Sequence, residues 1–375
     1  MKRAFSFILI LFILAFSSVT YASAEPTISA KSAVVMNGLT RDVLYSKNSE
    51  KKMSMASTTK IMTSLLLIES GNLDEVVTIS KYAAGIEGSS IGLRAGDKVT
   101  KRTLLLGMML ESGNDAATAA AEAVSGSLEE FALLMNKRAA EIGMKNSSFV
   151  TPSGLDAETH YTTAYDMALL TATALENKEF REVSSIVKTE VEIGGKKHTF
   201  TNHHRLLTEY EGCIGVKTGY TRKSGRCLVT AAKRNACLII TVTLNDSNDW
   251  EDHKEMLDYG FKNTDTVDIT YSDEKPELSV VGSNVSLVEL AIPTRQAGID
   301  NQNKKYITAE LTVDRFVYAP IVAGQTVGKV KYFYKDILIA EDSVYVGGDI
   351  EYSNIQFTDA DRFWKNFRLL FSFYK

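Results

Sequence analysis

Ser57 and Lys60 form the pair of side chains in this sequence best placed for nucleophilic chemistry. They lie in the stretch Met55–Thr63, where the apolar spacing predicts the first turns of a helix. Because residues i and i+3 share a helix face, the lysine amine can stand beside the serine hydroxyl. A serine needs a neighbouring base, and a lysine can be that base when burial and nearby cations lower its pKa. The spacing alone is a weak signal, because Ser-x-x-Lys occurs five times in the chain.

Two further motifs lie downstream in a fixed order. Ser112-Gly113-Asn114 follows the apolar run 104–110, whereas Lys217-Thr218-Gly219 precedes a strand-like run that begins near residue 226. Each motif is common by itself. The ordered set Ser-x-x-Lys, Ser-x-Asn and Lys-Thr-Gly is characteristic of serine β-lactamases and penicillin-binding proteins.

This set of residues predicts acyl transfer. We expect Ser57 to attack a carbonyl carbon while Lys60 accepts the serine proton. Backbone N–H groups of Ser57 and Tyr220 would stabilise the oxyanion. Ser112 would relay a proton between Lys60, Lys217 and the leaving amine. The predicted catalytic residues are therefore Ser57, Lys60 and Ser112.

A second group of residues is predicted to bind the substrate. The side chain of Asn114 can hydrogen-bond a substrate amide. Lys217 supplies a cation and Thr218 a hydroxyl, which together suit a terminal carboxylate. A substrate with a free carboxylate therefore fits better than an internal peptide. The predicted substrate-binding residues are Asn114, Lys217, Thr218, Gly219 and Tyr220.

The N-terminus has the pattern of a secretory signal peptide, residues 1–24. Lys2 and Arg3 precede the apolar run 5–16, and Ala22-Ser23-Ala24 is an A-x-A cleavage site. The apolar run is too short to span a bilayer comfortably. We therefore expect an exported protein that acts on the outer face of the cytoplasmic membrane.

The rest of the chain divides into three parts by pattern. Residues 25–262 show strands, then a largely helical stretch at 101–180, then strands and a closing helix, which predicts an α/β (α+β) catalytic domain. Residues 263–352 hold short β-branched runs and predict a small all-β domain. Residues 353–375 place aromatic side chains opposite lysines and arginines, which is typical of an amphipathic helix in the membrane interface.

Composition limits the remaining possibilities. The chain has 375 residues, a net charge of −4 and no basic domain, so nucleic acid is not an expected partner. The five histidines have no metal-ligand spacing, and we expect neither a metal nor a cofactor. We expect the histidines to lie at exposed positions or in turns. Cys213, Cys227 and Cys237 are interpreted as small core residues.

The sequence resembles the low-molecular-mass penicillin-binding proteins, the D-alanyl-D-alanine carboxypeptidases of the penicillin-binding protein 5 type. It looks most like the Gram-positive, sporulation-associated branch. The resemblance implies a fold of the β-lactamase and penicillin-binding transpeptidase type, removal of the terminal D-alanine from peptidoglycan pentapeptide, and acylation by penicillins. Further matching segments lie outside the three motifs; they are 115–117, 151–155, 160–168, 201–202, 215–216 and 220–221.

The sequence departs from the family at one position, and three other functions are also compatible with it. Some relatives have an arginine that helps to hold the substrate carboxylate, where this chain has Thr243–Ser247 without one. Carboxylate binding would then depend on Lys217, Thr218 and Arg222. The alternatives are a D,D-endopeptidase, a slow β-lactamase and a non-catalytic wall-binding scaffold.

Overall fold

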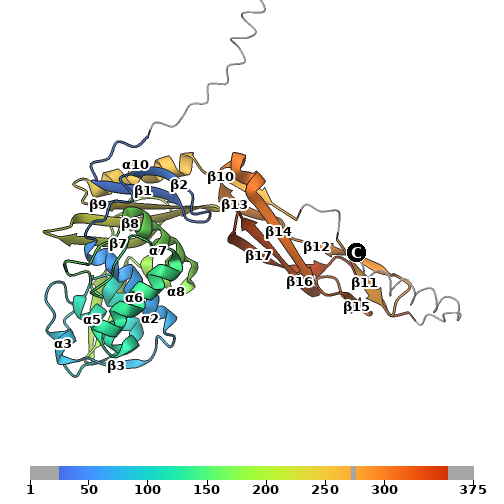
Figure 1. Ribbon diagram of the computed structural model, residues 1–375. Helices are drawn as coiled ribbons and strands as arrows, with labels where there is room; N and C mark the ends of the chain where they lie inside the picture. Colours follow the sequence, from blue (N-terminus) through green and yellow to red (C-terminus); the bar gives the residue numbers. More distant parts are fainter. Residues whose placement is uncertain (1–24, 272–275, 354–375) are drawn as a thin grey trace, which may run out of the picture. The chain divides into compact units, whose positions relative to one another are not determined.

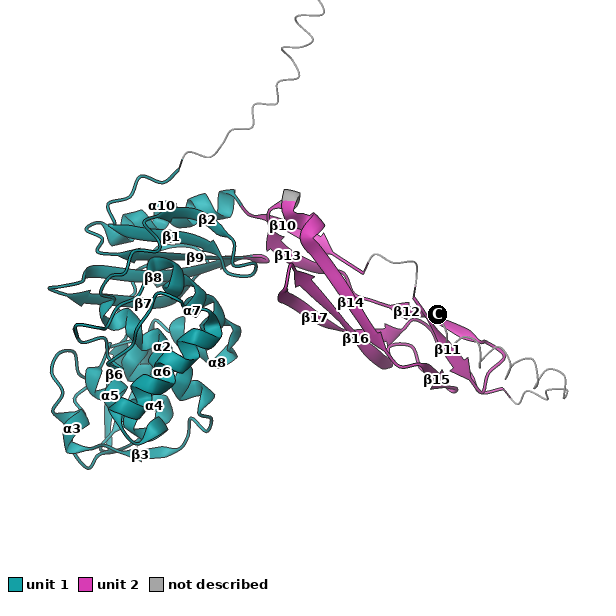
Figure 2. Cartoon of the chain, viewed as in Figure 1, with its two compact units in different colours: residues 1–234, 238–263 teal, residues 235–237, 264–375 magenta. Residues whose placement is uncertain are grey.

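The computed structural model describes residues 25–271 and 276–353. The chain forms two compact units, Met1–Arg234 with Leu238–Asn263, and Asn235–Cys237 with Thr264–Lys375 (Figure 2). The predicted signal peptide and nearly all of the predicted C-terminal helix lie outside the described residues. Among the described residues, no helix has the length and apolar character needed to cross a membrane.

The first unit is built on a five-stranded sheet in the order β2-β1-β9-β8-β7 (Figure 1). Strands from the two ends of the segment meet in its middle, where Val34 of β1 pairs with Val242 of β9. This arrangement confirms the predicted mixed α/β class. The strands are β1 (Ser32–Asn37), β2 (Val43–Lys47), β7 (Cys213–Thr221), β8 (Gly225–Arg234) and β9 (Cys237–Leu244).

Both faces of this sheet are covered, so β1 is buried along its whole length. Because side chains alternate across a strand, Val34 and Met36 pack into the core on the side of the large helical cluster, and Val35 packs into the core beneath α10 (Asp249–Lys262). At Gly260 of α10, a Cβ atom would lie 2.4 Å from Ile239. Glycine therefore lets this helix pack closely on the sheet.

The helical cluster covers the other face of the sheet, and it carries Ser57, Lys60 and Ser112, whereas Lys217 lies on the sheet strand β7. Its central helix, α2, is buried at every position but the last, which explains its lack of a polar face. The helices of the cluster are α2 (Lys60–Glu69), α3 (Lys81–Ala84), α4 (Lys101–Met109), α5 (Asn114–Ser125), α6 (Leu128–Ile142), α7 (Ala164–Glu176) and α8 (Lys178–Ser184).

Several short elements were not predicted from the sequence. The hairpin β3–β4 was missed, and strand β7 itself was not identified although it carries Lys-Thr-Gly. The strands predicted to follow the helical stretch are confirmed, and they begin with the hairpin β5–β6, which borders the helical cluster. Ser57 also lies in a 3₁₀ turn, η1, before α2 rather than in an α-helix. The missed or corrected elements are η1 Ala56–Thr59, β3 Val76–Thr78, β4 Lys98–Thr100 and α9 Leu206–Glu209, and the confirmed hairpin consists of β5 Lys188–Ile193 and β6 Lys196–Thr201.

Within its described residues, the second unit is all-β apart from one 3₁₀ turn, η2 (Asn301–Tyr306), which confirms the predicted all-β domain. It contains a six-stranded sheet, β14-β16-β17-β12-β11-β15, and the two-stranded pair β10-β13. Figure 1 shows β11 and β15 at one end of this unit and β10 and β13 at the other. The strands are β10 (Asp265–Ile269), β11 (Glu277–Val281), β12 (Leu287–Ala291), β13 (Arg295–Ile299), β14 (Ile307–Val313), β15 (Phe316–Tyr318), β16 (Thr326–Tyr334) and β17 (Ile337–Val346).

Candidate active site

Ser57 follows a residue with an unusual backbone conformation. Ala56 has a φ of 48°, in the left-handed region that non-glycine residues rarely adopt. Two contacts hold this turn: the hydroxyl of Thr59 donates to the Ala56 carbonyl at 2.8 Å, and the hydroxyl of Thr58 donates to the Met55 carbonyl at 2.6 Å. The strained turn at the nucleophile position is therefore fixed by its own neighbours.

The amine of Lys60 lies at the centre of the site and is fully buried. Its Nζ atom is 3.0 Å from Ser57 Oγ, 2.8 Å from Asn114 Oδ1 and 2.7 Å from the Ser153 carbonyl oxygen. Burial first, and then the nearby Lys217, hold the pKa of Lys60 well below its usual value, whereas Asp115 opposes the shift. The structure thus brings together Ser57 and Lys60, as the sequence predicted.

The three partners of Lys60 indicate how a neutral amine would be oriented. A neutral amine has two N–H donors and one lone pair. The Ser153 carbonyl can only accept, and Asn114 presents its oxygen because its amide nitrogen donates to the Glu87 carbonyl at 2.7 Å. Both N–H groups therefore have partners, and the lone pair is left facing the hydroxyl of Ser57. This is the geometry of a general base beside its nucleophile.

Asn114 also has contacts within the protein, besides the substrate contact predicted for it. Both ends of its amide are engaged within the protein, at Lys60 and at Glu87. Its neighbour Asp115 is buried and accepts hydrogen bonds from the Ser90 hydroxyl and from the backbone N–H groups of Ile91 and Leu93. The start of α5 thus positions the base and also fixes the loop over the site.

Strand β7 forms the opposite wall of the site and is the edge strand of its sheet. A Cβ atom on Gly219 would lie 3.0 Å from the Ser57 nitrogen, so the absence of a side chain lets β7 approach the nucleophile. Lys217 is almost completely buried, and burial lowers its pKa to about 7. Tyr220 projects outward with 66% of its surface exposed.

A hollow of about 370 Å³ opens directly above these residues. Ser57, Ser112 and Thr218 line it, which places members of all three motifs around one space. Within the part of the chain that the structure describes, no hydrogen bond joins the Ser112 hydroxyl to either lysine. The full lining is Ser57, Ser89, Ser112, His203, Thr218, Gly219, Tyr220, Arg226, Cys227, Asp249 and Trp250.

The cationic residues near the site lie in different positions relative to this hollow. Arg222 is exposed in the turn between β7 and β8 and, like Lys217, is not among the residues that line the hollow, whereas Arg226 is. Arg226 Nη1 is 3.1 Å from the carboxylate of Asp249. In the segment without an arginine, Asp246 accepts a hydrogen bond from the Ser29 hydroxyl, and burial raises its pKa to about 6. No sequence signal linked Arg226 to the site, because it lies outside the motifs.

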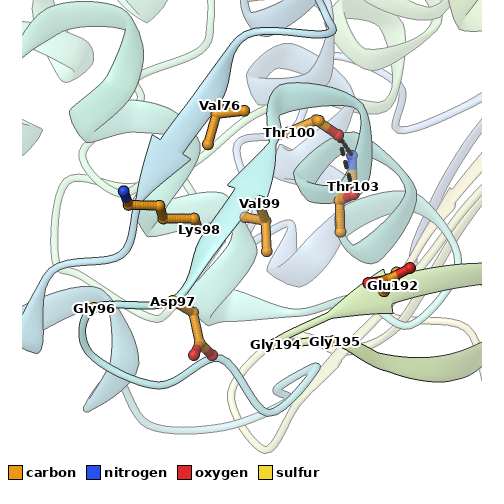
Figure 3. A pocket seen from close by; sticks show the side chains of 10 residues that line it. All are labelled: Val76, Gly96, Asp97, Lys98, Val99, Thr100, Thr103, Glu192, Gly194 and Gly195. Atoms are coloured by element: carbon orange, nitrogen blue, oxygen red, sulfur yellow. Dashed lines mark hydrogen bonds between the residues drawn. The ribbon is translucent and has the colours of Figure 1, made fainter.

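A larger hollow of about 540 Å³ lies elsewhere in the first unit, between the hairpins β3–β4 and β5–β6 (Figure 3). Its side chains include Asp97, Lys98 and Glu192, and the hydroxyl of Thr100 accepts from the backbone N–H of Thr103. None of the ten described residues that line it is a serine, cysteine or histidine. It therefore lacks a nucleophile of the kind found beside Lys60.

Most of the histidines and cysteines are buried or half-buried in the fold. His160, His204 and His253 are buried, which corrects the expectation of exposed or turn positions. No group of three or more histidine, cysteine or acidic side chains among residues 25–271 and 276–353 could hold a metal ion. The three cysteines are free thiols; Cys227 and Cys237 are buried, as predicted, and Cys213 is only half-buried.

His160 supports the turn that holds the nucleophile. Its Nδ1 accepts from the backbone N–H of Val150 at 2.9 Å, so the ring proton lies on Nε2 and is donated to the Thr59 hydroxyl at 2.8 Å. That hydroxyl donates in turn to the Ala56 carbonyl. Burial lowers the pKa of His160 to about 4, so the ring is neutral near pH 7. The contact joins residues about a hundred positions apart, so sequence analysis missed it.

Substituting Thr59→Val is expected to slow acylation of Ser57 by penicillin about tenfold, because a buried donor and a buried acceptor both lose their partner. The measurement is the second-order rate constant for acylation, alongside the thermal midpoint. Thr59→Ser keeps the hydroxyl and should retain the parent rate. A Thr59→Val enzyme that is less stable but acylates at the parent rate would contradict a positioning role.

Comparisons with known proteins agree with this site. Residues 19–248 match the Peptidase S11 family, described as D-alanyl-D-alanine carboxypeptidase, and residues 266–352 match the C-terminal domain of penicillin-binding protein 5. The D-alanyl-D-alanine carboxypeptidase DacF of Bacillus subtilis is 34% identical over 94% of this chain and 95% of its own length.

Solved structures give the same result. Penicillin-binding protein 5 from Haemophilus influenzae superposes with a TM-score of 0.64 at 28% identity and covers 88% of this chain and 100% of its own. The Streptomyces K15 DD-transpeptidase has a TM-score of 0.61 at 33% identity and covers 64% of this chain and 100% of its own. The chain therefore belongs to the Peptidase S11 family of D-alanyl-D-alanine carboxypeptidases, the low-molecular-mass penicillin-binding proteins.

Proposed function

We propose that this enzyme removes the terminal D-alanine of peptidoglycan stem peptides through an acyl-enzyme on Ser57, and that penicillins acylate the same serine. The observation that carries this assignment is the contact between Ser57 Oγ and the buried Lys60 amine, whose other two partners are acceptors. In the first step the serine oxygen bonds to the carbonyl carbon of the substrate, and the proton passes to Lys60.

Departure of D-alanine then breaks the peptide bond. The leaving amine takes up a proton by way of Ser112, which lines the hollow with Ser57. Water adds to the ester in the second step, with Lys60 again as the base, and releases the shortened peptide. The backbone N–H groups of Ser57 and Tyr220 stabilise the oxyanion in both steps; the approach of Gly219 to the Ser57 nitrogen supports this pairing.

The substrate carboxylate is assigned to Lys217 and Thr218, with Gly219 and Tyr220 of the same strand along the peptide. Asn114 is assigned a double role, since the oxygen that orients Lys60 leaves one N–H of its amide for the substrate. No cofactor or metal takes part in these steps.

The direct test is D-alanine release from diacetyl-Lys-D-Ala-D-Ala by the purified full-length chain. Release from this tripeptide, together with labelling by a fluorescent penicillin, is the expected result. Labelling without release, combined with cleavage of cross-linked dimers, would identify a D,D-endopeptidase. A folded protein that shows neither labelling nor release would support the scaffold alternative.

Binding of the carboxylate is expected to weaken as the pH rises above about 7. The pKa of Lys217 is lowered to about 7, so its amine is protonated below that pH and neutral above it. The substrate carboxylate stays charged throughout. KM should therefore be lower at about pH 6 than at about pH 8.5, and Lys217→Gln should give a high KM at both. A parent KM that does not change with pH would contradict the assignment.

Export and membrane association belong to the same proposal. The signal peptide pattern at 1–24 supports export, and the aromatic and basic tail at 353–375 supports attachment to the outer face of the membrane. Equal flotation on liposomes before and after substitution of the tail aromatics would contradict the attachment. A role in sporulation follows from the resemblance alone, and analysis of spore wall stem peptides in a deletion strain tests it.

A further inference from the structure

Three strands at one end of the second unit have an exposed apolar face. In the sheet, Phe316 of β15 and Leu287 of β12 both lie beside Ser279 of β11, and Tyr318 lies beside Val281. The alternate residues of these strands are buried. The outward side chains are exposed, 67% for Tyr318, 47% for Leu287 and 42% for Phe316. We name this surface the apolar face: Val281, Val285, Leu287, Phe316, Tyr318 and Tyr352.

The two segments that supply most of this surface carry no charge, although Glu277 and Glu289 follow on the same outward face of β11 and β12. Neither 279–287 nor 316–322 contains an acidic, basic or histidine residue, whereas 23% of the whole chain is charged. The rings of Phe316 and Tyr318 also pack edge to face, with centroids 5.3 Å apart. An exposed surface with aromatic rings and no charge is unusual for a surface in contact with water alone.

The chain reaches the predicted tail from the edge of this same surface. Tyr352 lies against the turn at Gly282, where a Cβ atom would be 3.5 Å from its ring. The backbone N–H of Ser353 donates to the Gly282 carbonyl at 3.1 Å, and the N–H of Asn284 donates to the Ser353 hydroxyl at 2.7 Å. The amphipathic pattern of 353–375 therefore starts beside the apolar face.

We propose that the apolar face inserts into the membrane interface beside the tail, as a second lipid contact on the all-β unit. Tyrosine and phenylalanine suit this region, because the rings enter the acyl boundary while the tyrosine hydroxyl stays with the headgroups. The six residues of the apolar face carry no charge themselves, so they can enter the interface of an anionic membrane while Glu277 and Glu289 stay further along the sheet. The proposal rests on the membrane attachment of the tail and extends it, since two contacts would fix the orientation of this unit on the bilayer.

The test compares four forms of the full-length chain by flotation with vesicles of phosphatidylglycerol and phosphatidylethanolamine. They are the parent, the face variant Phe316→Thr/Tyr318→Thr, the control variant Tyr306→Thr/Leu338→Thr and the tail variant Phe367→Ser/Phe371→Ser. Threonine suits strands, and both face positions point outward, so the fold is retained. Tyr306 and Leu338 are also exposed in the second unit but lie outside the apolar face. Fluorescent penicillin labelling confirms that every variant is folded.

We expect the partition coefficient of the face variant to fall about tenfold, while the control variant stays at the parent value, because two rings lose their apolar contact with lipid. The loss should persist in about 0.5 M salt, since the contact carries no charge. A face variant that floats like the parent would overturn the proposal. Stronger flotation would also overturn it and would indicate that the tail covers this face in solution.

The parent could form a dimer that dissociates in the face variant, while both forms float equally. That result would show that the apolar face contacts a second copy of the chain instead of lipid. The tail variant separates this proposal from the attachment on which it rests. If its flotation equals that of the parent, the tail is not an anchor. A loss confined to the tail variant, with the face variant unchanged, leaves the tail attachment standing and removes only the apolar face.

Discussion

Ser57→Ala is expected to lower D-alanine release by about 10⁴-fold or more and to abolish the covalent penicillin adduct, because the hydroxyl beside the Lys60 amine is lost. Among the residues that the structure describes, Ser57 Oγ is the only hydroxyl oxygen within hydrogen-bond distance of that amine. Losing one partly exposed hydroxyl removes no packing, so the thermal midpoint should stay close to the parent value. The measurements are D-alanine release and intact-protein mass after penicillin treatment.

Ser185→Ala is the matched control for this substitution. Ser185 also begins a Ser-x-x-Lys segment, but its hydroxyl donates to the Glu182 carbonyl at the surface. This variant should keep both parent activity and labelling. A stable penicillin adduct in Ser57→Ala would show that another residue is acylated, and the assignment of all three motifs would fail with it.

Lys60→Met is expected to slow acylation by a factor of about 10³, within the range that a general base contributes. Methionine fills a similar buried volume without a lone pair that could take the serine proton. Lys188→Met, at the exposed lysine of the Ser-x-x-Lys segment that begins at Ser185, should acylate at the parent rate. A Lys60→Met enzyme that acylates normally would exclude lysine as the base.

The pH dependence gives an independent measure of this lysine. Because the pKa of Lys60 is lowered well below its usual value, the neutral amine forms as the pH rises through that lowered pKa. The acylation rate should therefore increase with pH and reach a plateau well before about pH 10.4, where an ordinary lysine titrates. Lys60→Met should lose this rise. A parent rate that still increases near pH 10 would indicate a lysine with an unperturbed pKa.

Lys60→Met also has a structural consequence. The substitution leaves the Asn114 amide oxygen and the Ser153 carbonyl without their donor. Each unpaired buried group costs about 1–3 kcal/mol, although removal of a buried amine offsets part of this. We therefore expect a modest change of the thermal midpoint together with a large loss of rate, which separates the chemical role of Lys60 from a packing role.

Local patterns in the sequence determined a large part of the structure. Helix α6 lies within the predicted helical stretch 101–180, and its ends have local signals: Ser127 caps its first turn by accepting from the Glu130 N–H, and Gly143 ends it with a φ of 92°. Gly71 likewise has a φ of 77° just past α2. Such signals lie within a few residues of one another and can be recognised without the fold.

The order of the three motifs also predicted the chemistry and the family. Nucleophile, base and cation were recognised from residue type and spacing, because the reaction needs these groups whatever surrounds them. The alternation of β-branched residues in 263–352 predicted the all-β unit for a similar reason, since a period of two is a property of every strand. In these respects the sequence was sufficient.

Only the tertiary structure decided which other side chains serve the site. Strand β7 was missed because its residues show no simple alternation, since Val216 and Lys217 are both buried although they point to opposite faces. His160 reaches the nucleophile turn through Thr59, and Ser153 and Glu87 contribute carbonyl oxygens that every residue type possesses. These contacts join segments many residues apart. Because every residue has a backbone carbonyl, the residue type cannot indicate which carbonyl contacts the site. The sequence therefore determined which chemistry is expected of this protein, whereas the folded chain decided how burial lowers the pKa of Lys60 and how distant hydrogen bonds hold its amine beside Ser57.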